Sequence, residues 1–380
     1  MGRPRGAGPC RRGRAVGAEP RTGHARATAC RRRPGRSEPG AGGMSELLDA
    51  ALRRFFAERR ETNHHDAELW DALELATEGG KRFRPMLLLS VHEALGGTDL
   101  ERAAEVAAAM ELLHTAFVVH DDVIDGDRVR RGRPNVSGTF AARAASAGAD
   151  PGRAAGYGDA AGILAGDLAL AGAVRLVAGC GAAPDVVTRL LDLLEHALRV
   201  SAAGELADVR LSLGTDGADL GTILTMEEHK TAVYSFELPM RAGAVLAGAD
   251  AATCDRLGEL GRLLGVAFQL RDDLDGVFGE EAVTGKSTIS DLRAGKCTPL
   301  VAHARTTPWW PQIAPFIGDA ALGEPEAARV RELLDECGSR GFIEDLAAGY
   351  AEAARGVADA VGLEPGLQAW LAATAVRRAA

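Results

Sequence analysis

The chain has 380 residues, of which 46% are hydrophobic and only 4% aromatic, and its formal net charge is -9. This length and apolar share are enough for one large domain or two ordinary ones. Alanine, leucine and glycine dominate, which favours helices packed closely through small side chains. The acidic balance excludes nucleic acid as a partner of the main body, because phosphate binding needs a basic surface.

The charge is divided unevenly along the chain. Residues 1–43 hold eleven arginines against Glu19 and Glu38, a net charge of +9, so residues 44–380 carry -18. The basic segment is rich in glycine and proline and has no apolar periodicity, which predicts a disordered extension. A nucleic-acid arm or an organelle transit peptide are alternatives, although one serine and several prolines are atypical of transit peptides. We expect Met44 to be the natural start of a single domain over residues 44–380.

The cysteines show no spacing typical of disulfides or metal sites, and they are Cys10, Cys30, Cys180, Cys254, Cys297 and Cys337. This scatter is typical of a protein kept in a reducing compartment. No apolar run reaches the length of a membrane span, and no apolar segment follows the basic start. We therefore expect a cytoplasmic protein without an integral membrane segment.

From Ser45 onward, apolar residues recur at helical spacing nearly throughout. Pro85 is placed to open a helix that ends at Gly96-Gly97, and a longer helix is predicted over 101–125. A glycine- and alanine-rich loop is predicted over about 132–158. Further helices, with amphipathic ones after residue 320, are predicted over about 159–178, 184–212, 219–250 (interrupted at Pro239) and 252–278. Since strand-type alternation is nearly absent, the pattern predicts an all-α, single-domain helical bundle.

The first acidic cluster, His-Asp-Asp-Val-Ile-Asp, closes the predicted helix 101–125. Asp121 and Asp125 are one turn apart, so both carboxylates project from the same face. His114 lies near that face two turns earlier, and Phe117 continues the apolar stripe below the carboxylates. Like charges held close together are costly unless a cation neutralises them, which predicts a divalent metal site. A lone cluster of this kind would more often be a helix cap or a solvated helix end.

The second acidic cluster, Gln-Leu-Arg-Asp-Asp-Leu-Asp, supplies Asp272, Asp273 and Asp275 to a later helix. Phe268 lies one turn before Asp272, and Gln269 lies three residues before it, so the first arrangement is repeated. Two clusters on apolar stripes favour a metal cage between facing helices over two solvated helix ends.

Basic residues form a second pattern near turns and helix ends. Lys81 and Arg84 follow a glycine pair just before a predicted helix, where backbone donors and the helix dipole help to bind an anion. Other residues in comparable positions are Arg130, Arg131, Lys230, Thr231, Lys286 and Lys296. A P-loop is excluded, because its glycine-lysine-serine spacing after a strand is missing. Metal-binding carboxylates and a separate set of cations indicate two phosphorylated ligands, one bound through metals and one bound directly.

These motifs resemble the polyprenyl synthetase family, whose members are all-trans isoprenyl diphosphate synthases. The matching segments follow the family order and spacing, and they are GGKRFRP (79–85), HTAFVVHDDVIDGDRVRRGRP (114–134), GDLAL (166–170), HKTAVYSFELP (229–239), FQLRDD (268–273) and TGKSTISDLRAGK (284–296). The resemblance implies a helical bundle of the isoprenoid synthase type with a central active-site cavity. It also implies a homodimer.

The resemblance further implies roles for individual residues. Three magnesium ions that hold an allylic diphosphate would be ligated by Asp121, Asp125 and Asp272. Support would come from Asp122 and Asp273. These aspartates and Lys230 form the expected catalytic set, and the allylic substrate would also be contacted by Arg130, Lys230, Thr231, Gln269, Lys286 and Lys296. Isopentenyl diphosphate, which carries no metal in such enzymes, would be bound by Lys81, Arg84, His114 and Arg131.

The implied activity is that of a transferase. It would condense an allylic diphosphate with isopentenyl diphosphate to give an elongated all-trans prenyl diphosphate and free diphosphate. A class I terpene cyclase shares the fold and an aspartate cluster but does not need an isopentenyl diphosphate site. A non-catalytic subunit of a heteromeric synthase usually loses an aspartate motif, and a structural bundle with acidic metal sites leaves the ordered cations unexplained.

Product length would depend on the bulk beneath the first aspartate motif. The residues four and five positions before Asp121 are Phe117 and Ala116, and Leu113 lies deeper. A large ring one turn below the metals argues against very long products, while the alanine leaves some room. We predict short products, with geranylgeranyl diphosphate favoured over farnesyl diphosphate.

Two positions depart from the family pattern. Gly276 stands where the second motif commonly has its last aspartate, and Asp275 points elsewhere by the helical period. Because Asp272 remains, we expect activity to be retained. Glu205 replaces a frequent glutamine, and the pattern assigns no role to it or to Asp275.

Overall fold

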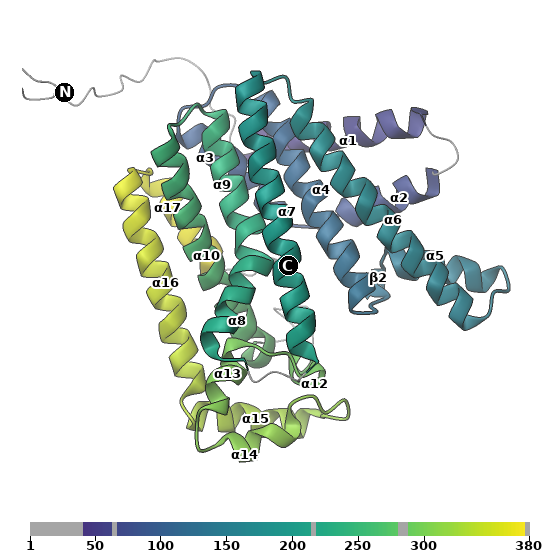
Figure 1. Cartoon of the computed structure of the whole chain (residues 1–380), viewed down its shortest axis with the longest axis vertical. Coiled ribbons are helices and arrows are strands. Elements are labelled where there is room, and N and C mark those ends of the chain that lie inside the picture. The colour runs from purple at the N-terminus through teal and green to yellow at the C-terminus, as the bar shows by residue number, and fades with distance from the viewer. Residues whose placement is uncertain (1–40, 63–66, 214–217, 280–287, 377–380) are drawn as a thin grey trace, which may run out of the picture. The chain divides into compact units, whose positions relative to one another are not determined.

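The computed structural model describes residues 41–62, 67–213, 218–279 and 288–376. The predicted extension over residues 1–43 lies outside them, except for its last three residues, which begin the first helix. Almost all of the described chain is helical, and its strands are confined to one short hairpin (Figure 1). The all-α prediction is confirmed.

The helices of the described chain follow one another with short connections. Their bounds are α1 Ala41–Thr62, α2 Ala67–Thr77, α3 Phe83–Ala94, α4 Leu100–Ile124, α5 Val136–Ser146, α6 Pro151–Ala178, α7 Pro184–Ser212, α8 Leu220–Glu227, η1 Glu228–Glu237, α9 Leu238–Leu246, α10 Ala251–Phe278, α12 Ser290–Ala294, α13 Pro299–Arg305, α14 Trp310–Ile313, η2 Ala314–Phe316, α15 Glu324–Glu336, α16 Ser339–Val361 and α17 Pro365–Val376.

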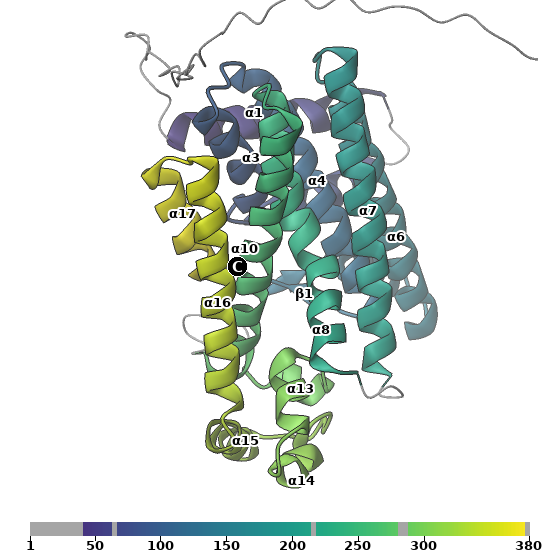
Figure 2. The same ribbon diagram turned by 60° about the vertical axis from the view of Figure 1, so that its left-hand side comes forward.

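Helix α4 runs through the core of the bundle. It packs against α1, α3 and α6, and its side chains Val106, Met110 and Leu113 are at most 2% exposed. Figure 2 shows α4, α6, α7 and α10 running alongside one another. The helix therefore has a rigid apolar body and a polar end, where the first aspartate motif lies.

Glycines bring the helices that carry the polar residues into backbone contact. A Cβ atom at Gly204 of α7 would lie 2.3 Å from the backbone nitrogen of Lys230 in η1. A Cβ at Gly265 of α10 would lie 2.4 Å from the Cβ of Ala232, also in η1. Larger residues at these glycines would push η1 away from both neighbours. The position of Lys230 is therefore fixed by close packing on two sides.

The predicted loop over 132–158 is wrong. Strands β1 (Val129–Arg130) and β2 (Arg133–Pro134) pair antiparallel, α5 follows, and α6 begins at Pro151. Asn135 and Asp150 cap the two helices by accepting hydrogen bonds from the backbone N–H groups three residues later. Alanine is the strongest helix former, and together with these caps it outweighs the glycines.

The predicted break at Pro239 is also wrong. Pro239 is the second residue of α9, and the chain is helical on both sides of it. The irregular segment is η1, a π-helix over Glu228–Glu237 that joins α8 to α9 without a gap. Such wide turns are rare and occur often at functional sites.

Two helices, α4 and α6, are long and apolar enough to cross a membrane by length and composition, which the sequence analysis did not foresee. In α4, 72% of the apolar stretch is buried inside the bundle. In α6 the value is 44%, and this helix packs along α4 and α5. Buried core helices pass the same length test, so neither helix is assigned as a membrane span.

Candidate active site

The first aspartate motif lies at the C-terminal end of α4 and meets two basic side chains. Asp122 is buried, and its Oδ1 accepts a hydrogen bond from Nε of Arg130 at 2.7 Å. The Asp121 carboxylate lies 3.5 Å from both an Arg130 nitrogen and Nζ of Lys230. Asp125 is exposed, and the nearby positive charges of Lys230 and Lys296 interact favourably with its carboxylate. Asp121 and Asp125 thus border solvent, whereas the buried Asp122 holds Arg130 in place by a hydrogen bond.

Lys230 is surrounded by carboxylates. Its Nζ lies 2.6 Å from Asp208, 3.1 Å from Glu205 and 3.5 Å from Asp121. Burial alone would lower the pKa of Lys230, but Asp208 and Asp121 raise it above its usual value, so the ammonium stays charged. The structure therefore gives Glu205 a partner. Asp208, which the sequence analysis missed, lies three residues later on the same helical face.

The second aspartate motif lies near the end of α10 and has different neighbours. Asp273 is buried, and its Oδ1 accepts a hydrogen bond from Nε2 of Gln269 at 2.9 Å. Burial raises the pKa of Asp273 to about 6. Burial and the nearby Asp273 raise the pKa of Glu227 well above its usual range, so the two acids favour a shared proton. Glu227 lies in α8 and carried no signal in the sequence.

The space beside Gly276 is filled by a carboxylate from another helix. A Cβ atom at Gly276 would lie 2.6 Å from Oδ2 of Asp291 in α12. Asp291 also lies 3.3 Å from Nζ of Lys296. The second motif lacks a carboxylate at Gly276, and the carboxylate of Asp291, from another helix, lies beside that position.

Two arginines near α4 have strained backbone angles, one just before α3 and one in the turn between β1 and β2. Arg82 and Arg131 have φ angles of 51° and 52°, and they are the non-glycine residues with positive φ in the described ranges. Arg82 contacts the buried Glu111 of α4 at 3.1 Å. Backbone strain of this kind persists when the surroundings enforce it, and it clusters at functional sites. Lys81 comes directly before Arg82, and Arg84 lies two residues after it in the first turn of α3. The backbone conformation of this turn therefore sets the direction of the Lys81 and Arg84 side chains.

His114 and Arg84 meet at Tyr234 of η1. An Arg84 nitrogen donates to the Tyr234 hydroxyl at 3.2 Å, and the rings of His114 and Tyr234 stack with centroids 6.2 Å apart. Burial and the nearby arginines lower the pKa of His114 well below its usual value, so its ring is neutral. The rings of Phe117 and Tyr234 pack edge to face, with their centroids 4.8 Å apart. Below Phe117, Ala116 and Leu113 are buried.

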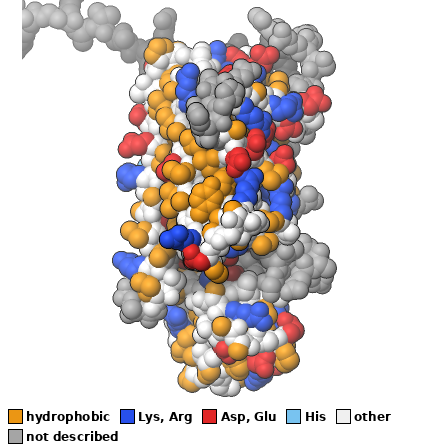
Figure 3. Space-filling model, turned by 90° about the vertical axis from the view of Figure 1, so that its right-hand side faces the viewer, with side chains coloured by type: hydrophobic (Ala, Val, Ile, Leu, Met, Phe, Trp, Pro, Cys, Tyr) orange, Lys and Arg blue, Asp and Glu red, His pale blue; other side chains and the backbone are white. Residues whose placement is uncertain are grey.

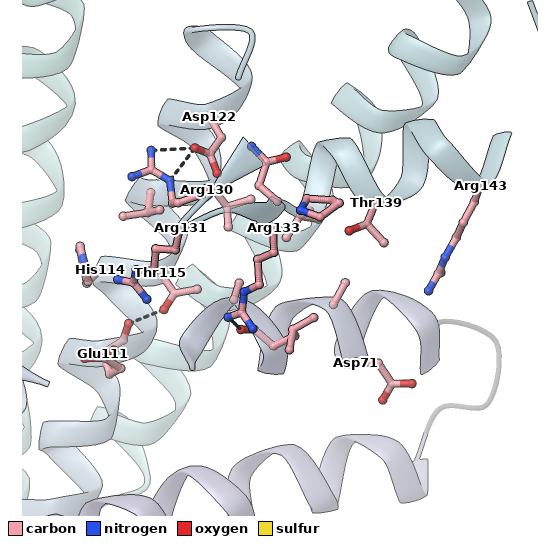
Figure 4. Close-up of a pocket in the computed structure, with 18 residues that line it drawn as sticks. Asp71, Glu111, His114, Thr115, Asp122, Arg130, Arg131, Arg133, Thr139 and Arg143 are labelled. Carbon is pink, nitrogen blue, oxygen red and sulfur yellow. Dashed lines mark hydrogen bonds and ion pairs between the residues drawn. The ribbon is translucent and has the colours of Figure 1, made fainter. Parts of the chain in front are cut away.

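A cavity of about 160 Å³ lies beside α4, bounded by α2, the hairpin and α5 (Figure 4). Asp122 and Arg130, predicted for the allylic site, line it together with His114 and Arg131, predicted for the isopentenyl site. Figure 4 shows the arginines projecting between α4 and α2. The structure therefore brings members of both predicted sets to one cavity. Lys286 lies outside the described residues.

The carboxylates of the two motifs suit Mg²⁺ ions that are bound together with a phosphate group. Within the described ranges, no three acidic, histidine or cysteine side chains are grouped so that they could hold a metal ion by themselves. Each ion would then take one or two carboxylates, from Asp121 and Asp125 or from Asp272, and complete its shell with diphosphate oxygens and water. That is the coordination Mg²⁺ prefers.

Comparison with known proteins identifies the family. The polyprenyl synthetase family model matches residues 67–319. The chain belongs to the polyprenyl synthetase family. A geranylfarnesyl diphosphate synthase of Aeropyrum pernix is 34% identical over 290 residues, covering 75% of this chain and 85% of that protein. A (2E,6E)-farnesyl diphosphate synthase of Mycobacterium bovis is 36% identical over 268 residues, covering 68% of this chain and 67% of that protein.

A solved structure shares the fold of this polyprenyl synthetase. The geranylgeranyl pyrophosphate synthase of Corynebacterium glutamicum, complexed with isoprenyl diphosphate and magnesium, matches with a TM-score of 0.79. The match has 27% sequence identity and covers 88% of this chain and 97% of that one. The predicted family and fold are confirmed.

Proposed function

We propose that this protein is a short-chain trans-prenyl diphosphate synthase with magnesium as its metal. It is a prenyltransferase by family, and the proposal adds the substrates and the residues. The observation that carries it is the presence of two differently built half-sites along α4. The first pairs carboxylates with Arg130 and Lys230, and the second gathers Arg84 and Arg131 around a neutral His114.

The first half-site would hold the allylic diphosphate. Asp121, Asp125 and Asp272 would bind three magnesium ions, which stabilise the departing diphosphate as Lewis acids. Arg130 and Lys230 place fixed positive charge where negative charge develops. Cleavage of the carbon–oxygen bond leaves an allylic cation, which the double bond of isopentenyl diphosphate attacks. Transfer of a proton from the resulting cation to the departing diphosphate would then restore an alkene.

The second half-site would hold isopentenyl diphosphate without a metal. Lys81, Arg84 and Arg131 would contact its diphosphate directly, and arginine does so with two parallel donors. The neutral ring of His114 can donate one further hydrogen bond. The Phe117 ring, one turn before Asp121, packs against the Tyr234 ring, and the two rings would keep water from the cation.

Phe117 is proposed to form the floor that limits the length of the product chain. Its ring is backed by Tyr234, and Ala116 and Leu113 are buried beneath it, so the floor is packed. We favour geranylgeranyl diphosphate over farnesyl diphosphate. The named relatives include synthases of geranylfarnesyl, geranylgeranyl and farnesyl diphosphate, so similarity alone leaves the length to experiment.

We propose that the protein is a homodimer and that it is located in the cytoplasm. Helix α6 exposes Tyr157, Ile163 and Leu164, each about half accessible, and hydrophobic side chains cover much of the face in Figure 3. An apolar face of this kind favours burial against a second copy. The cysteines of the described ranges are free thiols, as a reducing compartment requires. Light scattering of the purified protein tests the dimer, and a monomer would refute it.

One assay tests the function. Purified protein, Mg²⁺ and labelled isopentenyl diphosphate are incubated with each allylic starter in turn, and the products are separated by chromatography. A series of linear prenyl diphosphates is expected. Cyclised hydrocarbons formed from a starter alone would point to a terpene cyclase, and no product with any starter would point to a non-catalytic subunit.

A further inference from the structure

Arg84 is held by two consecutive side chains of η1. Ser235 Oγ accepts hydrogen bonds from Nε and from a terminal nitrogen of Arg84 at 3.1 and 2.9 Å. The same terminal nitrogen donates to the Tyr234 hydroxyl, and the guanidinium lies 4.9 Å from the centre of the Tyr234 ring. Two of the three guanidinium nitrogens are thereby engaged, which fixes the plane of the group.

Ser235 is suited to this contact because it is enclosed. Its side chain is 1% exposed, so water cannot replace it as the acceptor. A guanidinium has only donors, and leaving two of its nitrogens without an acceptor is unfavourable even where, as for Arg84, the group is partly buried. Removal of the Ser235 hydroxyl would therefore let the Arg84 side chain turn.

The π-helical winding of η1 makes this arrangement possible. In a regular α-helix, residues five apart differ by about 140° in direction. In a π-helix the backbone hydrogen bonds join residues five apart, so Lys230 and Ser235 lie nearly one above the other. Lys230 contacts Asp121, and Ser235 contacts Arg84. One rigid segment thus reaches both proposed half-sites.

We propose that Ser235 is a positioning residue that holds the Arg84 guanidinium in the orientation needed for the metal-free diphosphate. This rests on the proposed function, in which Arg84 binds isopentenyl diphosphate. Ser235 itself touches no substrate. Its loss should weaken the use of isopentenyl diphosphate and leave the allylic substrate unaffected, because Lys230 keeps its own contacts with Asp121 and Asp208.

The test compares Michaelis constants for the two substrates. Ser235→Ala should raise KM for isopentenyl diphosphate about tenfold, the loss expected when a charged donor loses its acceptor. KM for the allylic diphosphate should change less than about twofold. Ser235→Thr keeps the hydroxyl and should restore the parent value. Ser201→Ala removes another buried serine hydroxyl, in α7, and should change neither constant.

Further variants separate this inference from the function on which it rests. If Arg84→Ala leaves KM for isopentenyl diphosphate unchanged, the proposed substrate site is wrong. If Arg84→Ala raises that KM and Ser235→Ala does not, or raises both constants equally, the positioning role is wrong. In the Arg84→Ala background, Ser235→Ala should add nothing. Should Ser235→Ala fail to fold, Ser235→Cys keeps the volume with a weaker acceptor and should show the same selective rise.

Discussion

The two aspartate motifs read alike in sequence but have opposite surroundings. At the end of α4, Asp121 and Asp122 contact the cations Arg130 and Lys230. These contacts place positive charge beside each carboxylate, as a site for a metal-bound anion requires.

The second motif, on α10, is set deeper among acids and an amide. Asp273 is buried, with Gln269 as its hydrogen-bond donor and Glu227 as an acidic neighbour. Beside Gly276 lies the carboxylate of Asp291. We infer from this difference that the first motif meets the substrate directly, whereas the second is part of a packed network around the half-buried Asp272, its proposed metal ligand.

The largest expected effect is at the first motif. Asp121→Ala should lower kcat by roughly a thousandfold, because it removes a proposed metal ligand and the carboxylate that faces Lys230. Steady-state kinetics with saturating Mg²⁺ measures this. Asp359→Ala removes an exposed carboxylate from α16 and should leave kcat unchanged. Normal turnover of the Asp121 variant would refute the account of this motif.

The aromatic residues one turn before each motif should respond differently. Phe117→Ala should shift the products toward longer chains, because the ring forms the proposed floor. Phe268 is 9% exposed and packs in the core against Phe236, so Phe268→Ala should instead lower stability by about 3 kcal/mol. Product chromatography and denaturant unfolding of both variants distinguish these results. An unchanged product distribution for Phe117→Ala would show that Phe117 is not the floor.

Gly276→Asp tests whether the second motif has room for the usual aspartate. Its Cβ would meet the Asp291 carboxylate and bring two negative charges together, so stability should fall by about 2 kcal/mol. Asp291→Ala in the same chain should restore most of the loss. Thermal unfolding without Mg²⁺ measures both. If Gly276→Asp is as stable as the parent, Asp291 does not occupy that space.

The smallest expected effect is a pH dependence at the second motif. The pKa values of Glu227 and Asp273 are raised, so the folded protein binds more protons than the unfolded chain between about pH 4 and 6. Their contribution to stability is therefore full at low pH and is lost as the pH rises through the folded pKa values. In metal-free protein, Glu227→Gln should reduce that loss by about 1 kcal/mol.

Glu228→Gln is the matched control for this measurement. Glu228 lies next to Glu227 in sequence but contacts Arg262. Denaturant unfolding at pH 5 and pH 8 should give the parent's pH dependence for this variant. A parent protein that gains stability over this interval relative to Glu227→Gln would contradict the shared-proton arrangement.

The same contrast explains what the sequence could predict. The helix over 101–125 is observed as Leu100–Ile124, because a continuous apolar stripe is a local signal. Arg130 was identified because it follows the first motif by one short turn. The neighbours of the second motif, Glu227 and Asp291, come from other helices, and no periodicity within one segment reveals such contacts.

The errors have physical causes too. Glycines in the segment 132–158 suggested a loop, but alanine propensity and two helix caps prevailed. The π-helix over Glu228–Glu237 packs closely against Gly204 of α7 and Gly265 of α10, and these are contacts between different helices. Because Ser235 lies in η1 and Arg84 in α3, their contact could not be found from helical spacing within one segment.

Metal dependence of substrate binding tests the central claim most directly. Isothermal titration calorimetry is run with an allylic diphosphate alone and with isopentenyl diphosphate alone, each with Mg²⁺ and with a chelator. The allylic ligand should bind only with Mg²⁺ and lose its affinity in Asp121→Ala. Isopentenyl diphosphate should bind equally well without metal and lose its affinity in Arg84→Ala. Allylic binding that survives the chelator, or isopentenyl diphosphate binding that requires Mg²⁺, would contradict the division into two half-sites.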